Sequence, residues 1–413
     1  MCGGLDIRAK FPSLGKRMHH ADQNNRPIRA ARALRHRPGF VFLDSVTPGD
    51  AGISLLASEP DLVISGGDWE RLESELARRR KGGCPDGAAI GCVAFDGTFH
   101  FGFYDRPHRF NHERGSWKNP PGAFAPRPAE ECPALDFQPG VAREDFLAMV
   151  AAAQEYISAG DIYQVCLSHP FEASAAEGNA WGFFERLRQC SPAPYSAFLD
   201  FGKFQVASAS PECFLRMSGR NISTSPIKGT RPRRPDPIQD LRSEQDLLNS
   251  PKEIAELVMI TDLERNDLGQ VCEFGSVRVT DLLRLERYEQ VFHMVSTVQG
   301  QLRADVSHVR ALRECFPGGS ISGAPKKRAI EIIRELEPFP RGLYTGAIGY
   351  FGYRGESRFS IAIRTAVFEA GRASFHAGAG IVADSVPEQE WQETMDKTAG
   401  LMLAAGRRGY PGQ

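Results

Sequence analysis

Two pairs of glutamates recur at one spacing in two separate segments of the chain. Glu253 and Glu256 lie in SPKEIAEL, and Glu390 and Glu393 lie in SVPEQEWQE. Residues three positions apart share one face of a helix, so each pair presents two carboxylates side by side. Four carboxylates that faced one another would need a cation, and magnesium binds oxygen ligands of this kind. The alternative is that glutamates in a first helical turn only complement the helix dipole, and spacing alone favours that alternative.

Lys228 is a candidate nucleophile because of the turn in which it stands, PIKGTRPR. An amine attacks only after losing its proton, and a free lysine, with a pKa of about 10.4, is less than about 0.1% neutral at pH 7. Burial or a nearby cation would lower this pKa by about three units, which corresponds to about 4 kcal/mol. The alternative is a solvated lysine in a loop.

Two glycine-rich segments are candidate anion sites. In FPGGSISGAPKK, the amides around Gly323 and Ala324 would meet an anion at the start of a helix. A P-loop needs Lys and Ser or Thr directly after its last glycine, and neither follows here, so a nucleotide site of that type is excluded. Residues 378–383 satisfy G-x-G-x-x-A, but a new helix start follows directly. We therefore expect a tight turn that contacts an anion at most.

Three helices with marked starts would position these groups. An S-x-x-E capping box with proline at the first helical position begins at Ser250 and leads a helix to about Leu268. The same device at 385–388 predicts a helix over 390–403. The third helix follows Pro325 and carries apolar residues at helical spacing from Ala329 to Leu336.

The remaining pattern predicts a mixed α/β protein. Strand-like runs at 204–209, 346–353 and 359–368 alternate with the helices. Before them, 40–44 and 87–95 read as strands and 68–81 as a polar helix, with no recognisable catalytic cluster. Residues 105–140 are dense in proline, glycine and charge, which predicts a long surface connection between a smaller N-terminal part and a larger C-terminal part.

Composition excludes several classes of function. Of the 413 residues, 41% are hydrophobic and 24% are charged, as in ordinary globular proteins. Lys and Arg total 50 against 51 Asp and Glu, so no global field attracts nucleic acid or an anionic membrane. The nine cysteines are scattered without a C-x-x-C pair, and neither a signal peptide nor a membrane span is apparent. We therefore expect a cytoplasmic protein.

Seven motifs in fixed order resemble the chorismate-binding family that includes anthranilate synthase component I. The motifs are QVCLS, SASPECF, PIKGTRPR, ITDLERNDLGQV, FPGGSISGAPKKRAIEII, IAIRT and GAGIVADSVPEQEWQE, and they cover roughly residues 143–404. The resemblance implies an α+β fold of two packed β-sheets surrounded by helices, with chorismate and magnesium between them. Residues 1–140 would be the variable N-terminal subdomain and linker, and 141–413 the chorismate-binding region. FLDS, at 42–45, resembles the segment that holds tryptophan in some members.

The resemblance also implies roles for individual residues. Glu256 and Glu393 would bind magnesium directly, and Glu253 and Glu390 would support them through water. His293 resembles the histidine beside the leaving-group side of the ring. The residues implied to hold the substrate are Thr230, Tyr344, Arg364, Gly323, Ala324, Gly378, Ala379, Gly380 and Lys397.

Two positions distinguish members of the family. Isochorismate and salicylate synthases activate water with a lysine where this chain has Gln164, which disfavours water chemistry. Anthranilate synthases usually read PIAGT, whereas PIKGT is typical of aminodeoxychorismate synthase component I, in which the lysine attacks carbon 2 of chorismate. Lys228 occupies this position, and Glu212 of SASPECF would be the general acid and base. Cys166 replaces an asparagine common in the family.

The expected product is 4-amino-4-deoxychorismate, the precursor of para-aminobenzoate and folate. No G-x-C-x-G segment is present, so ammonia would come from a separate glutamine amidotransferase subunit. Two alternatives stay open: anthranilate synthase component I, with Lys228 a spectator, and a non-catalytic homologue that binds chorismate or tryptophan. The complete carboxylate set with Lys228 and Glu212 argues against the second.

Overall fold

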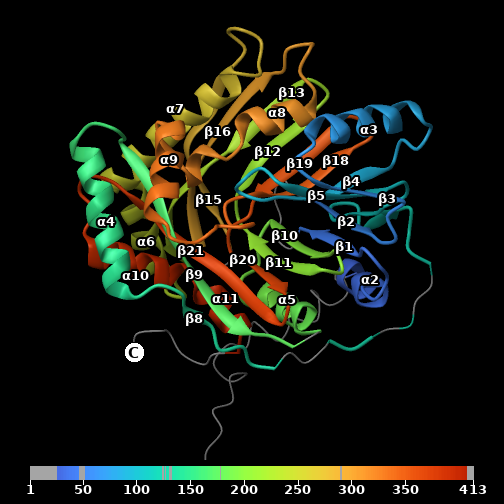
Figure 1. The fold of residues 1–413 in the computed structure, drawn as a ribbon, viewed down its shortest axis with the longest axis horizontal. Coiled ribbons are helices and arrows are strands. Elements are labelled where there is room, and N and C mark those ends of the chain that lie inside the picture. Colours follow the sequence, from blue (N-terminus) through green and yellow to red (C-terminus); the bar gives the residue numbers. More distant parts are fainter. Residues whose placement is uncertain are drawn as a thin grey trace, which may run out of the picture.

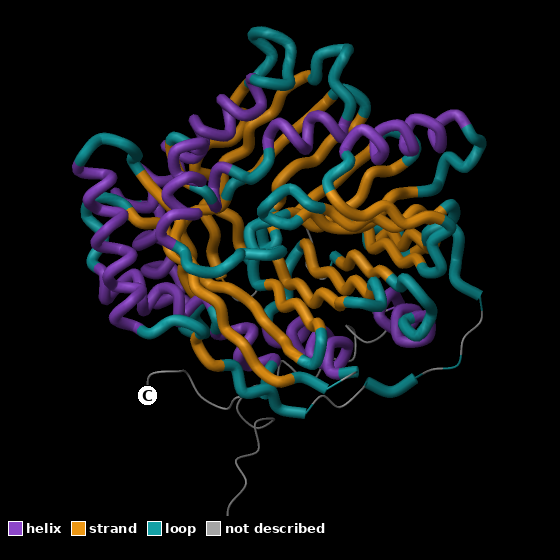
Figure 2. The backbone as a smooth tube through the Cα atoms, viewed as in Figure 1, coloured by secondary structure: helices purple, strands orange, loops and turns teal. Residues whose placement is uncertain are grey.

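Two antiparallel β-sheets lie against each other at the centre of the molecule, with helices outside them (Figures 1 and 2). The computed structural model describes residues 26–45, 52–122, 125, 127–129, 133–176, 178–288 and 291–406. The α+β class and the two packed sheets predicted from the sequence are confirmed.

The first sheet, sheet A, has 11 strands. Its order is β17 (Gly323–Ala324), β9 (Gln164–Ser174), β21 (Arg372–Ile381), β20 (Thr365–Glu369), β11 (Phe204–Ser210), β10 (Tyr195–Asp200), β1 (Val41–Asp44), β2 (Ile53–Ala57), β6 (His108–Asn111) and β7 (Ser116–Lys118), and β8 (Gln138–Pro139) also pairs with β9.

The second sheet, sheet B, has 10 strands. Its order is β14 (Ile227–Pro232), β16 (Val291–Gln301), β13 (Asn221–Ser225), β12 (Cys213–Ser218), β19 (Glu356–Ile361), β18 (Ala347–Gly352), β4 (Ala88–Val93), β5 (Phe99–Tyr104) and β3 (Leu62–Gly66), and β15 (Arg278–Arg287) also pairs with β16.

The central strands are apolar on both faces because the middle of each sheet is covered on both sides. Successive side chains of a strand point to opposite faces, so on β10 Phe198 packs under the helices whereas Leu199 packs between the sheets. On β18, Tyr350 faces sheet A and Phe351 faces the helices of sheet B. This double burial fixes the register of each strand, since a slip of one residue would exchange the two faces.

The helices form three groups. Those packed on the outer face of sheet A are α2 (Arg26–Leu34), α5 (Asn179–Cys190) and α11 (Ala399–Ala404). Those on sheet B are α3 (Trp69–Lys81), α8 (His308–Cys315), α7 (Pro251–Gly269) and α6 (Pro237–Leu248). The third group lies at the left of Figure 1, at one end of sheet A, and comprises α4 (Arg143–Ser158), α9 (Lys326–Leu336) and α10 (Pro387–Lys397).

The N-cap predicted at Ser250 is confirmed, but the return half of the capping box is not formed, because the Ser250 N–H donates to the Leu247 carbonyl at 3.3 Å instead of to Glu253. Ser250 is the N-cap of α7, its hydroxyl accepts the Glu253 N–H, and Pro251 begins the helix. The predicted apolar face of α9 is also confirmed, since Ala329, Ile332 and Ile333 are buried. Local sequence was sufficient in these cases because the signals act within one helical turn.

The capping box predicted at Ser385 is wrong. The N-cap of α10 is Val386, with no side-chain cap, and the helix ends at Lys397 before a separate helix, α11. The Ser385 hydroxyl donates instead to Glu390 Oε1 at 2.7 Å. The Ser385 oxygen accepts from the Val382 N–H at 3.0 Å, so it bonds to an amide before the helix and not to one in its first turn.

Two strand predictions are also corrected. Residues 105–140 include strands β6 and β7, because Phe110 is buried and packs against Trp117. The run 359–368 is not one strand but the end of β19 in sheet B and the start of β20 in sheet A. The chain changes sheet at Arg364, whose φ is +49°. This is a left-handed conformation that sequence periodicity does not reveal.

The N-terminal region contributes to both sheets. Strands β1, β2, β6 and β7 belong to sheet A, and β3, β4 and β5 belong to sheet B. The expected division at residue 140 stays a prediction.

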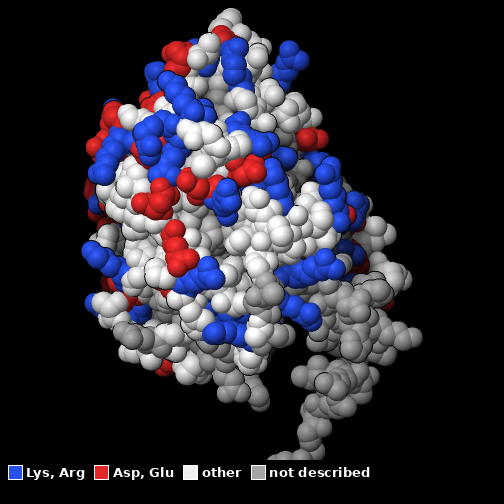
Figure 3. All heavy atoms as spheres, turned by 90° about the vertical axis from the view of Figure 1, so that its right-hand side faces the viewer, with Lys and Arg blue, Asp and Glu red and all other residues white. Residues whose placement is uncertain are grey.

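The surface carries mixed charge. Figure 3 shows Lys and Arg interspersed with Asp and Glu over one side of the molecule. No helix in the described ranges is long and apolar enough to cross a membrane. The cysteines within those ranges are all free thiols.

Candidate active site

Lys228 lies on β14, at the edge of sheet B and opposite Met294 of β16. The register shifts directly after it, and Gly229 has a φ of +76°. A Cβ on Gly229 would lie 3.2 Å from a Glu253 oxygen, so glycine lets β14 approach the start of α7 closely. The lysine side chain is 16% exposed, and its Nζ lies 3.6 Å from Glu256 Oε2.

The predicted lowering of the Lys228 pKa is wrong. Burial acts to lower the pKa of the ammonium, but the ionisable groups around it raise the pKa by more, first the thiol of Cys166 and then the carboxyl groups of Glu256 and Glu212. Lys228 is therefore a buried cation in the unliganded chain. For nucleophilic attack it must transfer a proton to a nearby base.

Gln164 and Gly380 bring sheet A to this lysine. Gln164 begins β9, and Gly380 lies opposite Cys166 on the neighbouring strand β21. A Cβ on Gly380 would lie 2.3 Å from Gln164 Nε2 and 3.6 Å from Lys228 Nζ. Both polar atoms of the Gln164 side chain are buried and have no hydrogen-bond partner among the described residues. A buried amide without partners is rare, which indicates that a ligand completes its hydrogen bonds.

Glu212 is the third group beside Lys228. It is 5% exposed and precedes β12. Burial raises its pKa to about 7, against the opposing effects of a hydrogen bond from Ser320 and the charge of Lys228. A carboxyl group with a pKa near neutrality can both give and accept a proton, which suits a general acid and base.

Each of the four glutamates lies beside a cationic side chain. Glu253 pairs with Arg231 at 3.3 Å, Glu256 with Lys228 at 3.6 Å, Glu390 with Lys252 at 3.8 Å and Glu393 with Lys397 at 2.6 Å. The starts of α7 and α10 face each other, since Lys252 of α7 reaches Glu390 of α10.

The donor set fits magnesium in its chemistry. In the part of the chain that the structure describes, no three His, Cys, Asp or Glu side chains lie close enough together to hold a metal as they stand. All four candidates are nonetheless carboxylates, which magnesium prefers. Glu390 Oε2 is also buried without a hydrogen-bond partner in the described ranges, as expected of an oxygen that awaits a cation.

The residues expected to hold the substrate occupy both sheets. Lys397 Nζ donates to the Gly378 carbonyl at 2.9 Å, and a Cβ on Gly378 would lie 2.8 Å from the Tyr344 hydroxyl. Gly378, Ala379 and Gly380 lie inside β21, so the predicted tight turn is wrong. The glycines are there because side chains from neighbouring elements fill the space of a Cβ.

His293 and Thr230 lie opposite each other on β16 and β14, and their side chains are hydrogen-bonded at 2.9 Å. Burial, and then the charge of Arg364, lowers the His293 pKa to about 4, so its ring is neutral at pH 7. Burial also lowers the pKa of Arg364, whose side chain has no hydrogen bond or ion pair within the described residues. Arg364 is thus available to an anionic ligand.

Gly323 and Ala324 form β17, which pairs with Val165 and Gln164 of β9. Position 323 favours glycine for two reasons. Its φ is +139°, which other residues rarely adopt, and a Cβ there would lie 2.2 Å from the Gln164 carbonyl oxygen. Their contact with substrate stays a prediction.

The sequence did not indicate Arg341 and Glu337, a fully buried pair joined at 2.7 Å. Arg341 also donates to the Cys166 carbonyl, and Glu337 accepts from the Ser168 hydroxyl and amide. The pair therefore holds β9 beside Gln164. Its only signal was a Glu and an Arg four residues apart in a segment without helical pattern.

The family profile described as chorismate binding enzyme matches residues 69–403. The chain belongs to the chorismate-binding enzyme family. This coarser part of the sequence interpretation is confirmed, and the match covers all the site residues described above.

Several curated relatives of this chorismate-binding protein are named anthranilate synthase component 1. Anthranilate synthase component 1 of Aquifex aeolicus is 47% identical over 262 residues, which is 63% of this chain and 53% of that protein. The chain thus spans about half the length of that relative. Others at 42–46% identity carry the same name.

Solved structures give the same family. Anthranilate synthase component I from Streptococcus pneumoniae has a TM-score of 0.74 at 30% identity and covers 92% of this chain and 98% of its own. The menaquinone-specific isochorismate synthase from Escherichia coli has a TM-score of 0.75 at 18% identity over 95% of this chain and 99% of its own, which shows the shared fold.

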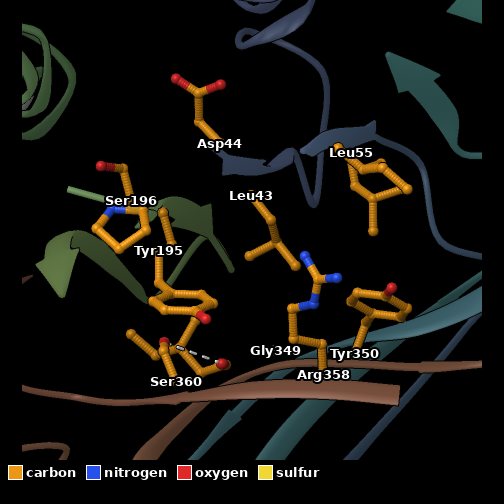
Figure 4. A pocket seen from close by; sticks show the side chains of 13 residues that line it. Leu43, Asp44, Leu55, Tyr195, Ser196, Gly349, Tyr350, Arg358 and Ser360 are labelled. Atoms are coloured by element: carbon orange, nitrogen blue, oxygen red, sulfur yellow. Dashed lines mark hydrogen bonds between the residues drawn. The ribbon is translucent and has the colours of Figure 1, made fainter. Parts of the chain in front are cut away.

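The FLDS segment of this family member lines a small cavity between the sheets. Figure 4 shows Leu43, Tyr195, Tyr350 and Arg358 around it. Its volume is about 40 Å³, enough for about three water molecules. Both oxygens of Asp44 are already engaged, by Ser54 and Arg188 at 2.6 Å each.

We predict that L-tryptophan leaves the chain unaffected, because an indole is too large for the cavity and Asp44 has no oxygen to offer. The measurement is the melting temperature with and without millimolar tryptophan, with chorismate as the positive control. A saturable rise with tryptophan would contradict the prediction.

We predict that Glu256→Gln and Glu393→Gln each lower turnover at least about 100-fold and abolish the rise in melting temperature with magnesium, because each removes a candidate metal ligand. Glu388→Gln is the matched control, since Glu388 is a glutamate in the same first turn of α10 that is not among the candidate ligands. Equal effects of all three variants would mean that these glutamates act only on the helix dipole.

Proposed function

We propose that the chain is an aminodeoxychorismate synthase component I, which converts chorismate and ammonia to 4-amino-4-deoxychorismate and water. The observation that carries the proposal is the position of Lys228. Its amine lies beside Gln164, Glu212 and Glu256, where sheets A and B meet. Removing a lysine ammonium from water costs free energy, so a lysine with no function in this place would destabilise the fold.

In the first step, the Lys228 ammonium passes a proton to ionised Glu212, and the neutral Lys228 Nζ then attacks carbon 2 of chorismate. The ring double bonds shift, and the bond from carbon 4 to its hydroxyl breaks. Glu212, with its pKa of about 7, supplies a proton so that the hydroxyl leaves as water. His293 is neutral and held by Thr230, so it orients the ring by a hydrogen bond and adds no charge.

In the second step, ammonia attacks carbon 4 and the lysine leaves carbon 2. Glu212, now ionised, takes the surplus proton from the new ammonium group and returns it to the released Lys228 amine, which restores both groups. The unpartnered amide of Gln164 supports this route, because it can accept a hydrogen bond from ammonia but cannot act as the base that water requires.

Magnesium, where bound, would stabilise negative charge on a substrate carboxylate. Glu256 and Glu393 would hold it, with Glu253 and Glu390 behind them. Arg364, Tyr344 and the β21 glycines would take the other carboxylate.

A second candidate is anthranilate synthase component I, which the names of the curated relatives favour. Under that alternative ammonia would end on carbon 2, and Lys228 would only neutralise the glutamates. We favour aminodeoxychorismate because Lys228, at the position that PIKGT implies for the nucleophile, would attack carbon 2 itself and would obstruct the ammonia that the alternative needs there.

Ammonia would come from a glutamine amidotransferase subunit. A separate lyase would then convert the product to para-aminobenzoate for folate synthesis.

We predict that the chain alone, given chorismate, magnesium and ammonium at alkaline pH, forms 4-amino-4-deoxychorismate. Glutamine should replace ammonium only after a glutaminase is added. The product is identified by chromatography and mass spectrometry, and by its conversion to para-aminobenzoate with a lyase. Anthranilate as the main product would support the second candidate, and isochorismate would contradict the role given to Gln164.

We predict that Lys228→Ala lowers aminodeoxychorismate formation about 100-fold or more while chorismate still raises the melting temperature, because only the nucleophile is lost. Lys252→Ala is the control, since Lys252 is an exposed lysine that also pairs with a site glutamate. If Lys228→Ala kept normal aminodeoxychorismate formation, covalent catalysis would be wrong.

A further inference from the structure

Glu264 is a buried carboxylate that the mechanism does not use. It lies on the inner face of α7 and is 2% exposed. The Gly319 N–H donates to its Oε1 at 2.9 Å, and the Thr224 hydroxyl donates to its Oε2 at 3.3 Å. Both oxygens are therefore engaged, one by an amide and one by a hydroxyl.

The amide belongs to a short 3-10 turn, Gly319–Ile321, that reaches Glu212. Ser320, the second residue of the turn, lies close enough to Glu212 to lower the pKa of its carboxyl group. The turn packs tightly on α7, since a Cβ on Gly319 would lie 2.8 Å from Leu263 and 3.0 Å from Glu264. A chain of contacts thus runs from Glu264 through the Gly319 amide and the Ser320 hydroxyl to Glu212.

We propose that Glu264 is a positioning residue that holds Ser320 against Glu212 and so orients the acid and base of the reaction. The inference rests on the proposed function, because it assumes the role given to Glu212. A hydrogen bond at one end of a turn restricts the residue beside it, and catalytic groups need such support to keep their geometry.

The charged groups around Glu212 and Glu264 determine how a substitution of Glu264 changes the electrostatics of the site. Glu212 faces the cations Lys228 and Lys397 and the carboxylate of Glu264. Glu264 itself faces Asp267 and Lys326, which are hydrogen-bonded to each other. Burial, and next the charge of Asp267, raises the pKa of Glu264 to about 7. Above that pH, one substitution removes the charge of Glu264 and another removes its reach, so charge and position can be separated.

Glu264→Asp keeps the charge but is one methylene too short to accept from Gly319. We expect kcat to fall about tenfold with the KM for chorismate changed less than about twofold, as for a misoriented acid and base. The limb of the kcat–pH profile that reports Glu212 should move to higher pH, because a carboxylate that loses a donated hydrogen bond binds its proton more tightly.

Glu264→Gln keeps the acceptor for Gly319 and removes the charge. We expect kcat within about threefold of the wild type and a limb that moves to lower pH or stays, because a negative neighbour of Glu212 is lost. Asp262→Asn is the matched control on the exposed side of α7. Circular dichroism checks that every variant is folded.

A kcat and a pH profile equal to those of the wild type in Glu264→Asp would overturn the inference. An equal fall in kcat in Glu264→Gln would also overturn it, because the effect would then be due to charge. Glu212→Gln is measured in the same assay. If Glu212→Gln is fully active, the proposed role of Glu212 fails whatever the Glu264 variants do. If it is inactive while Glu264→Asp is normal, only the positioning inference fails.

Discussion

The ion pair between Lys228 and Glu256 is the interaction on which the site depends. An ammonium buried without a counter-charge would cost roughly 3–5 kcal/mol, so the lysine requires carboxylates around it. Those carboxylates come from α7, α10 and the residue before β12, and the lysine comes from β14. Elements of both sheets and two helices therefore place their charged side chains around the Lys228 ammonium. The same carboxylates keep the amine protonated until the substrate and a base change its surroundings.

Glycine at the junction of the sheets makes this convergence sterically feasible. Gly380 leaves room for the Gln164 amide, and Gly229 leaves room for the start of α7 beside Lys228. Arg364 belongs to the same junction, since the chain crosses there from sheet B to sheet A in a left-handed conformation. The candidate site residues thus lie where strands end or where the chain passes from one sheet to the other, and the packed core fixes their positions.

Signals that act over one helical turn could be read from the sequence, as at Ser250, where the cap and the proline agree. Roles for Lys228 and the glutamates could be predicted because the residue types and their order resemble one family, and these roles stay predictions. The rest depends on tertiary contacts. Ser385 gives its hydroxyl to the buried Glu390 instead of capping the helix, and the direction of the Lys228 pKa shift follows from glutamates on other elements. No local pattern contains that information.

The relatives and the lysine favour different products, and the covalent step separates them. Wild-type chain mixed with chorismate and magnesium without ammonia, quenched rapidly and examined by intact-mass and peptide mass spectrometry, tests the step directly. The account predicts an adduct with the mass of chorismate less one water, on the peptide that contains Lys228. Unmodified Lys228 under trapping conditions, in a preparation that forms aminodeoxychorismate once ammonium is added, would contradict it.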